Sequence, residues 1–243
     1  MVSATLLGLM NFERSLLSAQ IILLTVNFFF TFNINFYKAL KLLMYRITME
    51  WEITITDIEY EKCKEFAEKS SSSQREHRSG GTMIRNNYQI FSDTLRGKMG
   101  EIATKNFLEQ PPLNFKEIEL DFEIYPRGVW DREDFKIYDK RFSIKTAKDF
   151  SKYLLLETKD LERGDTYDYY VLVLVNEKKR TAQIVGYIPK NEMQTVSEKT
   201  LDLKKGESIP KTGVTLDADN HARHKDDLLN SEYDWKSLVE SKA

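Results

Sequence analysis

The sequence predicts a mixed α/β domain that follows a hydrophobic N-terminal extension. Residues 169–175 form a nearly continuous apolar run rich in aromatic and β-branched residues, which is typical of a strand buried on both faces. Residues 91–108 carry one apolar stripe at helical spacing. Several shorter segments alternate between apolar and polar residues, as half-buried strands do. We therefore expect one main domain over residues 49–243, with residues 1–48 as a separate extension.

Composition places the chain among globular proteins. Charged residues make up 30% and apolar residues 41%, which excludes a disordered chain. The single cysteine, Cys63, excludes an internal disulfide and a cysteine-based zinc site, and it fits a reducing, cytoplasmic setting. A passive nucleic-acid coat protein is usually strongly basic, whereas this chain has a net charge of −2. That charge is compatible with a nuclease, which gathers acids around a metal.

The first 48 residues raise a separate question. No charged residue occurs from Ser15 to Tyr37, and this run is long enough for a membrane helix. Basic residues follow the run, so a membrane span would leave the main domain in the cytoplasm. The asparagines within the run are costly in lipid. Two alternatives therefore stay open: a buried helix, or a non-essential extension ahead of a true start at Met44 or Met49.

The main domain is predicted to begin with a strand, a helix and a loop. Residues 50–56 alternate as a strand does, and Asp57 is a suitable cap for a helix up to Lys69. Residues 70–81 are polar and end in glycine, which predicts a loop. Its arginines and one just beyond predict either a solvated surface or a DNA-phosphate contact: Arg75, Arg78 and Arg85.

The second helix is predicted over residues 91–108, with Ser92 or Asp93 as its cap. Gly97 and Gly100 lie inside it, and glycine in a helix indicates close packing or close approach of a ligand. The residues of its buried stripe are Leu95, Met99, Ile102, Ala103 and Phe107.

Most of the remaining chain is predicted to form a sheet. The expected strands are residues 118–124, 134–138, 141–147, 153–157, 169–175 and 182–188, with 169–175 at the centre. The polar tail is expected to contain a short helix over residues 224–229. Its apolar anchors are Leu228, Leu229, Tyr233, Trp235 and Leu238.

The candidate chemistry lies at residues 134–146, which read as a short β-hairpin. The turn has the length that brings Asp134 back beside the return strand. Ser143 and Lys145 share one face of that strand, because side chains two apart point the same way. Glu101, on the preceding helix, is a further acid that can lean over this point.

An acid and a lysine on paired strands suit phosphodiester hydrolysis. The reaction needs an activated water and neutralisation of the phosphate charge, and Mg²⁺ held by carboxylates in an open site supplies both. A lysine helps to position or deprotonate the water, or stabilises the developing charge. Without further evidence the same residues are a solvated strand lysine and a turn-forming acid.

Five segments taken in chain order resemble the motifs of the PD-(D/E)xK nuclease superfamily, and in particular type II restriction endonucleases. They are Gly97–Ala103, Asp134, Ser143–Thr146, Asp168–Val175 and Ile184–Pro189. The resemblance implies a restriction-endonuclease-like fold with a central mixed sheet flanked by helices. It also implies Mg²⁺-dependent cleavage of double-stranded DNA at a short specific sequence. A homodimer would match a palindromic site, and a companion DNA methyltransferase is expected.

The resemblance also implies roles for individual residues. Asp134 matches the metal-binding acid of the hairpin, Lys145 the catalytic lysine, and Glu101 the helix acid. Ser143 stands where the family usually has Asp or Glu, so another acid must complete the metal site. Glu101 is the first candidate for that role. Asp131 and Glu133 are the next candidates for that role.

Other residues and other functions remain open. Lys148 and Lys152, just past the hairpin, are expected either to contact DNA phosphate or to be solvated surface residues. His221 and His224 would share a helical face, but a surface or DNA-contact role is favoured over a metal site because no acid or cysteine completes one. The alternative functions are a repair, junction or mobile-element nuclease, a DNA-binding protein with a decayed nuclease site, and a membrane-anchored domain.

Overall fold

The computed structural model describes residues 51–72, 86–116, 118–124, 134–162 and 167–240. Within these ranges the chain forms two β-sheets flanked by helices. This confirms the predicted mixed α/β class with a mixed sheet and flanking helices. The predicted division at residue 48 and the hydrophobic run 15–37 lie outside the described residues.

Sheet A has five strands in the order β1-β6-β5-β3-β2. Its only parallel pair among the described strands is β3 with β5, and the other neighbours are antiparallel. The prediction that residues 169–175 form the central strand is confirmed, because β5 is the third of the five. The strands are β1 (Trp51–Thr54), β2 (Phe135–Ile137), β3 (Lys140–Lys148), β5 (Tyr169–Asn176) and β6 (Thr181–Pro189).

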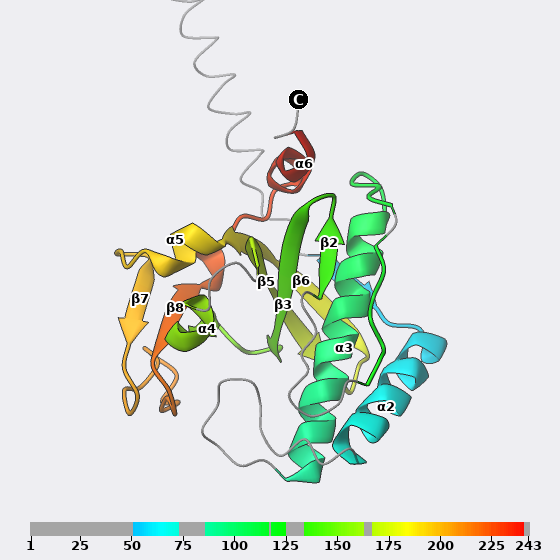
Figure 1. The fold of residues 1–243 in the computed structure, drawn as a ribbon, viewed down its shortest axis with the longest axis horizontal. Helices are drawn as coiled ribbons and strands as arrows, with labels where there is room; N and C mark the ends of the chain where they lie inside the picture. Colours follow the sequence, from blue (N-terminus) through cyan, green and yellow to red (C-terminus); the bar gives the residue numbers. More distant parts are fainter. Residues whose placement is uncertain (1–50, 73–85, 117, 125–133, 163–166, 241–243) are drawn as a thin grey trace, which may run out of the picture. The chain divides into compact units, whose positions relative to one another are not determined.

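Sheet B is a smaller antiparallel sheet in the order β4-β8-β7. Figure 1 shows it beside α4 and α5, on the side of sheet A away from α3. Only β4 was expected from the sequence. The elements are β4 (Tyr153–Glu157), α4 (Thr158–Glu162), α5 (Lys190–Gln194), β7 (Thr200–Leu203) and β8 (Asn220–His224).

The longest helix, α3 (Asn87–Glu109), packs against α2 (Asp57–Ser72) and crosses β3 of sheet A (Figure 1). It begins earlier than predicted, because Asn86 and Gln89 form a reciprocal capping box there; Ser92 and Asp93 lie inside the helix. The last described helix, α6 (Glu232–Glu240), ends the described chain. Among the described residues, none of the helices has the length and apolar character needed to cross a membrane.

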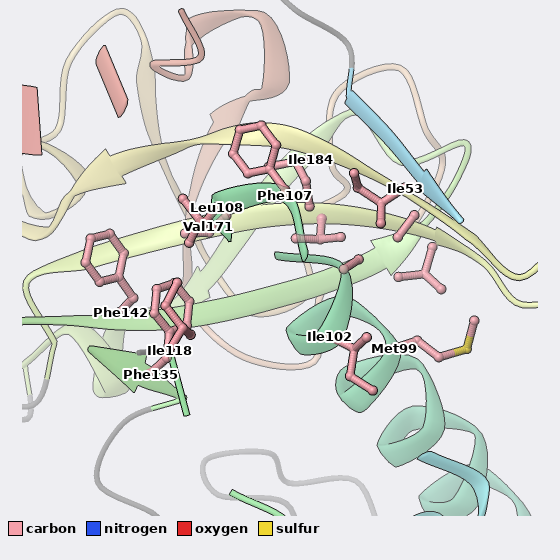
Figure 2. Close-up of a cluster of buried hydrophobic side chains, with 14 of the residues drawn as sticks. Ile53, Met99, Ile102, Phe107, Leu108, Ile118, Phe135, Phe142, Val171 and Ile184 are labelled. Atoms are coloured by element: carbon pink, nitrogen blue, oxygen red, sulfur yellow. The ribbon is translucent and has the colours of Figure 1, made fainter. Parts of the chain in front are cut away.

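The main core lies between α3 and one face of sheet A. The predicted stripe of α3 is buried, from Leu95 at 4% exposed to Met99 and Ala103 at 0%. Figure 2 shows Phe135 and Phe142 together in this core, with Ile102 and Met99 on the facing helix. The two phenylalanine rings stack with centroids 4.9 Å apart, which ties β2 to β3.

A second core fills the space between the other face of sheet A and sheet B. Leu154 and Leu156 of β4 are buried here with Tyr170, Leu172 and Leu174 of β5. Since β5 contributes side chains to both cores, it is covered on both faces, as its continuous apolar sequence predicted.

Two predicted elements are wrong. Residues 118–124 were expected to form a strand, but the structure assigns them no strand. Phe122 of this segment packs instead on α2, with its ring centroid 5.6 Å from that of Phe66, and Ile118 is buried in the main core. Residues 224–229 were expected to form a helix, but they hold the end of β8 and a single 3-10 turn, Lys225–Asp227. Of the predicted anchors in the tail, Leu228, Trp235 and Leu238 are buried, whereas Tyr233 is 58% exposed.

Gly186 on β6 is a position at which we expect a side chain to destabilise the fold. Its φ is +148°, and a Cβ there would lie 2.7 Å from the carbonyl oxygen of Leu229. We expect Gly186→Ala to lower the free energy of unfolding by about 1–3 kcal/mol. Gly97→Ala is the control, since its Cβ would meet no atom within 4 Å. In a helix this change is expected to raise stability by about 0.5–1 kcal/mol. Both variants are compared with the wild type by urea denaturation. A free energy of unfolding for Gly186→Ala equal to that of the wild type would contradict this expectation.

Candidate active site

The carboxylate of Asp134 lies where β2 and β3 separate. The two strands pair from Phe135 with Phe142 to Ile137 with Lys140. One residue before β2, the amide of Asp134 donates to the carbonyl of Phe142 at 3.2 Å. The next hydrogen bond to β3 comes from the side chain of Asp134 and not from its backbone: Oδ2 accepts from the amide of Ile144 at 2.5 Å. The hairpin therefore fixes this carboxylate against the edge of β3.

Ser143 and Lys145 are the β3 residues next to this carboxylate. The hydroxyl of Ser143 hydrogen-bonds to Asp134, and the ammonium of Lys145 interacts with it electrostatically. Ser143 is only 2% exposed, whereas Lys145 is partly exposed. The Nζ of Lys145 lies 6.0 Å from the ring centroid of Tyr170, on the face of sheet A that carries the second core. The predicted grouping of Asp134, Ser143 and Lys145 is thus present in the structure.

Burial governs the acidity of Asp134. Loss of solvent raises the pKa of its carboxyl above the ordinary value for aspartate. Lys145, the amide of Ile144, Lys98 and the hydroxyl of Ser143 each lower the pKa, but they do not cancel the effect of burial. A carboxylate in this setting is stabilised by any additional cation.

Helix α3 approaches β3 from the opposite face. A Cβ on Gly100 would collide with the side chain of Thr146 and would touch that of Ile144 at 3.6 Å. Gly100 therefore serves close packing of helix on strand, one of the two roles predicted for it. Because side chains alternate along a strand, Ile144 and Thr146 face α3, whereas Ser143 and Lys145 face away from it.

Glu101 is held on the α3 side by Lys98. The ammonium of Lys98 lies 2.6 Å from Oε2 of Glu101, and both side chains are 10% exposed. The same ammonium donates to the carbonyl of Asp121 at 2.6 Å. Glu101 also acts on α2, where its charge and, more strongly, burial raise the pKa of Cys63 to about 12. The structure therefore places Glu101 in a buried ion pair between two helices.

Lys98 is the residue of this site that the sequence analysis did not select. It is 8% exposed, and its charge acts on Asp134 as well as on Glu101. It lies above two aromatic rings, 4.9 Å from the centroid of Phe66 and 5.2 Å from that of Phe122. The available signal was its spacing of three residues from Glu101, which puts the two side chains next to each other on a helix.

Removal of Lys98 is expected to destabilise the protein strongly. Lys98→Met leaves the buried carboxylate of Glu101 without its ammonium partner, and loss of one member of a buried pair costs about 3–5 kcal/mol. The double variant Lys98→Met/Glu101→Gln should recover most of this loss, because no buried charge is left unpaired. Urea denaturation of both variants and the wild type measures the effect. Equal stability of the single variant and the wild type would show that the pair is solvated.

The raised pKa of Asp134 predicts a pH-dependent stability. A folded-state pKa above the unfolded one gives a contribution that is fully present below the unfolded pKa. This contribution is lost as the pH rises through the folded pKa. Asp134→Asn keeps an oxygen acceptor for the amide of Ile144 but cannot ionise. In metal-free buffer we expect this variant to be more stable than the wild type above the folded pKa, with the advantage shrinking at lower pH. If urea denaturation finds the variant less stable at every pH, the carboxylate is a structural group.

The carboxylate at Asp134 fits Mg²⁺ better than a cation whose ligands must all come from the protein. Within the described ranges, no three His, Cys, Asp or Glu side chains converge to hold a metal ion. Mg²⁺ commonly uses one or two carboxylates and completes its shell with water and substrate phosphate. The buried carboxylate of Asp134 is one such carboxylate, whereas Glu101 is paired with Lys98 on the α3 side.

The other predicted site residues are dispersed. Lys148 lies at the exposed end of β3. The histidines are on β8 and not on a helix, so their predicted common face is wrong: Nδ1 of His221 contacts the carbonyl of Met193 at 2.7 Å, and His224 caps the 3-10 turn. The acids Asp131 and Glu133 and the three arginines fall outside the described residues: Arg75, Arg78 and Arg85.

A polar hollow of about 270 Å³ lies elsewhere on sheet A, towards the β5–β6 turn. Its lining includes Glu52, Asp149 and Gln183, but not Asp134, Ser143 or Lys145. This hollow is therefore separate from the candidate active site.

Comparisons of this chain with protein-family models, with curated proteins and with solved structures found no match. Function is therefore inferred from the geometry of the site.

Proposed function

We propose that this protein is an Mg²⁺-dependent endonuclease that hydrolyses double-stranded DNA at a short specific sequence. The proposal includes a restriction-endonuclease-like fold, a homodimer and a companion methyltransferase. The observation that carries it is the carboxylate of Asp134, which is fixed by the amide of Ile144 at the point where two paired strands separate, with Lys145 beside it. A purely structural aspartate gains little from a position where burial raises its pKa.

Each residue has a defined task in this proposal. Asp134 would hold Mg²⁺, with Glu101 as the second acid; the bound ion would supply an activated water and charge neutralisation at the phosphate. The amide of Ile144 and the hydroxyl of Ser143 keep the Asp134 carboxylate oriented. Lys145 directs a positive charge toward the phosphate, where negative charge develops during hydrolysis. For Glu101 to take part, its ion pair with Lys98 must open.

A second candidate function is DNA binding without cleavage. It is favoured by Ser143, which is buried at 2% exposed where an acid is expected, and by the engagement of Glu101 with Lys98. In that case the site holds too few free carboxylates to retain the metal, and the protein binds DNA as a decayed nuclease.

Digestion of supercoiled plasmid by the full-length protein distinguishes these functions. The proposed endonuclease produces discrete bands with Mg²⁺ and none with EDTA. A repair or junction nuclease also depends on Mg²⁺ but gives no fixed set of bands. Binding in a gel-shift assay without cleavage in Mg²⁺ or Mn²⁺ supports the decayed site. Failure both to cleave and to bind contradicts the proposal and the second candidate.

A further inference from the structure

The buried ammonium of Lys98 interacts with both acids of the candidate active site. It lies 2.6 Å from Oε2 of Glu101, and its charge also acts on the carboxylate of Asp134. Lys98 and Glu101 are each 8% exposed, so solvent and salt screen this pair weakly. The ammonium therefore supplies, from within the protein, part of the positive charge that two buried carboxylates require.

The packing of α3 on β3 holds these groups in one region. Gly100 directly precedes Glu101, and a Cβ on it would lie 3.6 Å from the side chain of Ile144. The amide of Ile144 is the donor that fixes Oδ2 of Asp134. The turn of α3 that carries Lys98 and Glu101 is therefore packed on the stretch of β3 that binds Asp134.

Lys98 also has partners that are not acids. Its Nζ donates to the backbone carbonyl of Asp121 at 2.6 Å. It lies 4.9 Å from the ring centroid of Phe66 and 5.2 Å from that of Phe122, within the range of a cation–π contact. These groups stabilise the ammonium when its carboxylate partner leaves. Release of Glu101 therefore does not leave a buried lysine without partners.

The ammonium of Lys98 competes with a divalent cation at Asp134 for the carboxylate of Glu101. A divalent cation attracts a carboxylate more strongly than an ammonium does at the same distance, because its charge is twice as large. While the ion pair is closed, the second acid is withheld from the metal. The apparent affinity for the metal is therefore lowered by the fraction of molecules in which the pair is open.

We infer that Lys98 is an internal counter-ion of the candidate active site, which holds Glu101 in the metal-free protein and is displaced from it by the divalent cation. The inference rests on the metal site of the proposed function and not on the DNA. Lys98 then stabilises the metal-free protein and weakens metal binding. It acts through Glu101, so it is a regulatory residue and not a catalytic one.

Binding of Mn²⁺ to the full-length protein without DNA tests this inference. Mn²⁺ takes the same carboxylate ligands as Mg²⁺, and isothermal titration calorimetry measures its dissociation constant. Lys98→Gln keeps a donor for Glu101 but removes the charge, and it is expected to bind Mn²⁺ roughly 10- to 100-fold more tightly than the wild type. Glu101→Gln is expected to bind it roughly 10- to 100-fold more weakly. Lys105→Gln removes the lysine of another α3 ion pair, with Glu109, and is expected to leave the affinity unchanged.

Stability with and without Mn²⁺ gives a second readout. In metal-free buffer Lys98→Gln is expected to be less stable than the wild type. Mn²⁺ should raise its stability by more than that of the wild type, because stabilisation by a ligand of the native state grows with its affinity. If the variant is unfolded without metal, the expected result is refolding on addition of Mn²⁺. An equal loss of stability with and without Mn²⁺ would mean that the ion pair is only structural, and it would overturn the inference.

The outcomes separate this inference from the proposed function. If the wild type cleaves DNA but Lys98→Gln binds Mn²⁺ no more tightly than the wild type, the inference is overturned and the nuclease proposal stands. If the wild type does not cleave DNA in Mg²⁺, but Lys98→Gln gains and Glu101→Gln loses affinity for Mn²⁺, the inference stands and the nuclease proposal fails. An equal gain by Lys105→Gln would show a general effect of charge and would overturn the inference.

Discussion

Replacing Lys145 with alanine is expected to reduce Mg²⁺-dependent DNA cleavage by about 10²–10⁴-fold, the range seen for groups that transfer protons or stabilise charge in the transition state. Lys145 is partly exposed but its charge also acts on the buried carboxylate of Asp134, so the variant should fold with some loss of stability. The measurement is the rate of plasmid cleavage at saturating Mg²⁺, together with the free energy of unfolding from urea denaturation.

A matched control separates catalysis from charge. Lys205→Ala removes an exposed lysine from the connection after β7 and is expected to cleave at the wild-type rate. Lys145→Arg keeps the charge but changes the shape and the acidity of the donor, and it should remain strongly impaired if the ammonium group itself is needed. Wild-type cleavage by Lys145→Ala would remove this lysine from the mechanism.

Replacing Trp235 with alanine is expected to lower the free energy of unfolding by about 3–5 kcal/mol. Trp235 is fully buried, with ring centroids 5.1 Å from Phe107 and 4.7 Å from Tyr187. Its Nε1 donates to Oδ1 of Asn230 at 3.2 Å. The variant therefore removes a large apolar side chain, two ring contacts and a hydrogen-bond donor, and it leaves a cavity between α6, α3 and β6.

The control for Trp235 lies two residues away. Tyr233 is on the same helix but is 58% exposed, so Tyr233→Ala should cost less than about 1 kcal/mol. Urea denaturation with a common slope for all three proteins gives the comparison. Equal stability of Trp235→Ala and the wild type would show that α6 does not dock on the core.

The correctly predicted elements are those whose hydrophobic pattern is complete within a single helix or strand. The stripe of α3 and the apolar run of β5 each bury a complete pattern within one element, so no partner has to be known. The alternation of residues 118–124 shows the limit of this reasoning. It reports that one side of an extended segment is buried, but it cannot say whether a sheet or a pair of helices covers that side. Here Phe122 packs against Phe66 of α2, whereas Ile118 is buried in the same core as Phe135 and Phe142 of sheet A.

Two strands of sheet B, β7 and β8, were not predicted, for a different reason. Strand β8 buries polar residues that hydrogen-bond to distant partners: His221 with the carbonyl of Met193, and Arg223 with the hydroxyl of Thr200 at 2.8 Å. A polar sequence reads as a surface segment, because only the tertiary fold supplies those partners. The same residues were therefore interpreted as part of a polar tail.

The candidate site likewise has one part that the local sequence predicts and one part that depends on the tertiary fold. The neighbourhood of Asp134, Ser143 and Lys145 follows from the hairpin alone, since turn length and strand alternation fix it. The ion pairing of Glu101 does not follow from the hairpin, because it depends on how α3 packs against α2 and on the ammonium of Lys98. For Glu101 to join Asp134 in the proposed metal site, its buried ion pair with Lys98 must open.

The most direct test of the account is plasmid cleavage by full-length Asp134→Asn beside the wild type in Mg²⁺, with the stability of both proteins measured on the same preparations. The account predicts discrete products from the wild type and none from the variant, while the variant is at least as stable as the wild type at neutral pH. Cleavage by both proteins, or by neither, would contradict the assignment of Asp134 as the acid of a DNA-cleaving site.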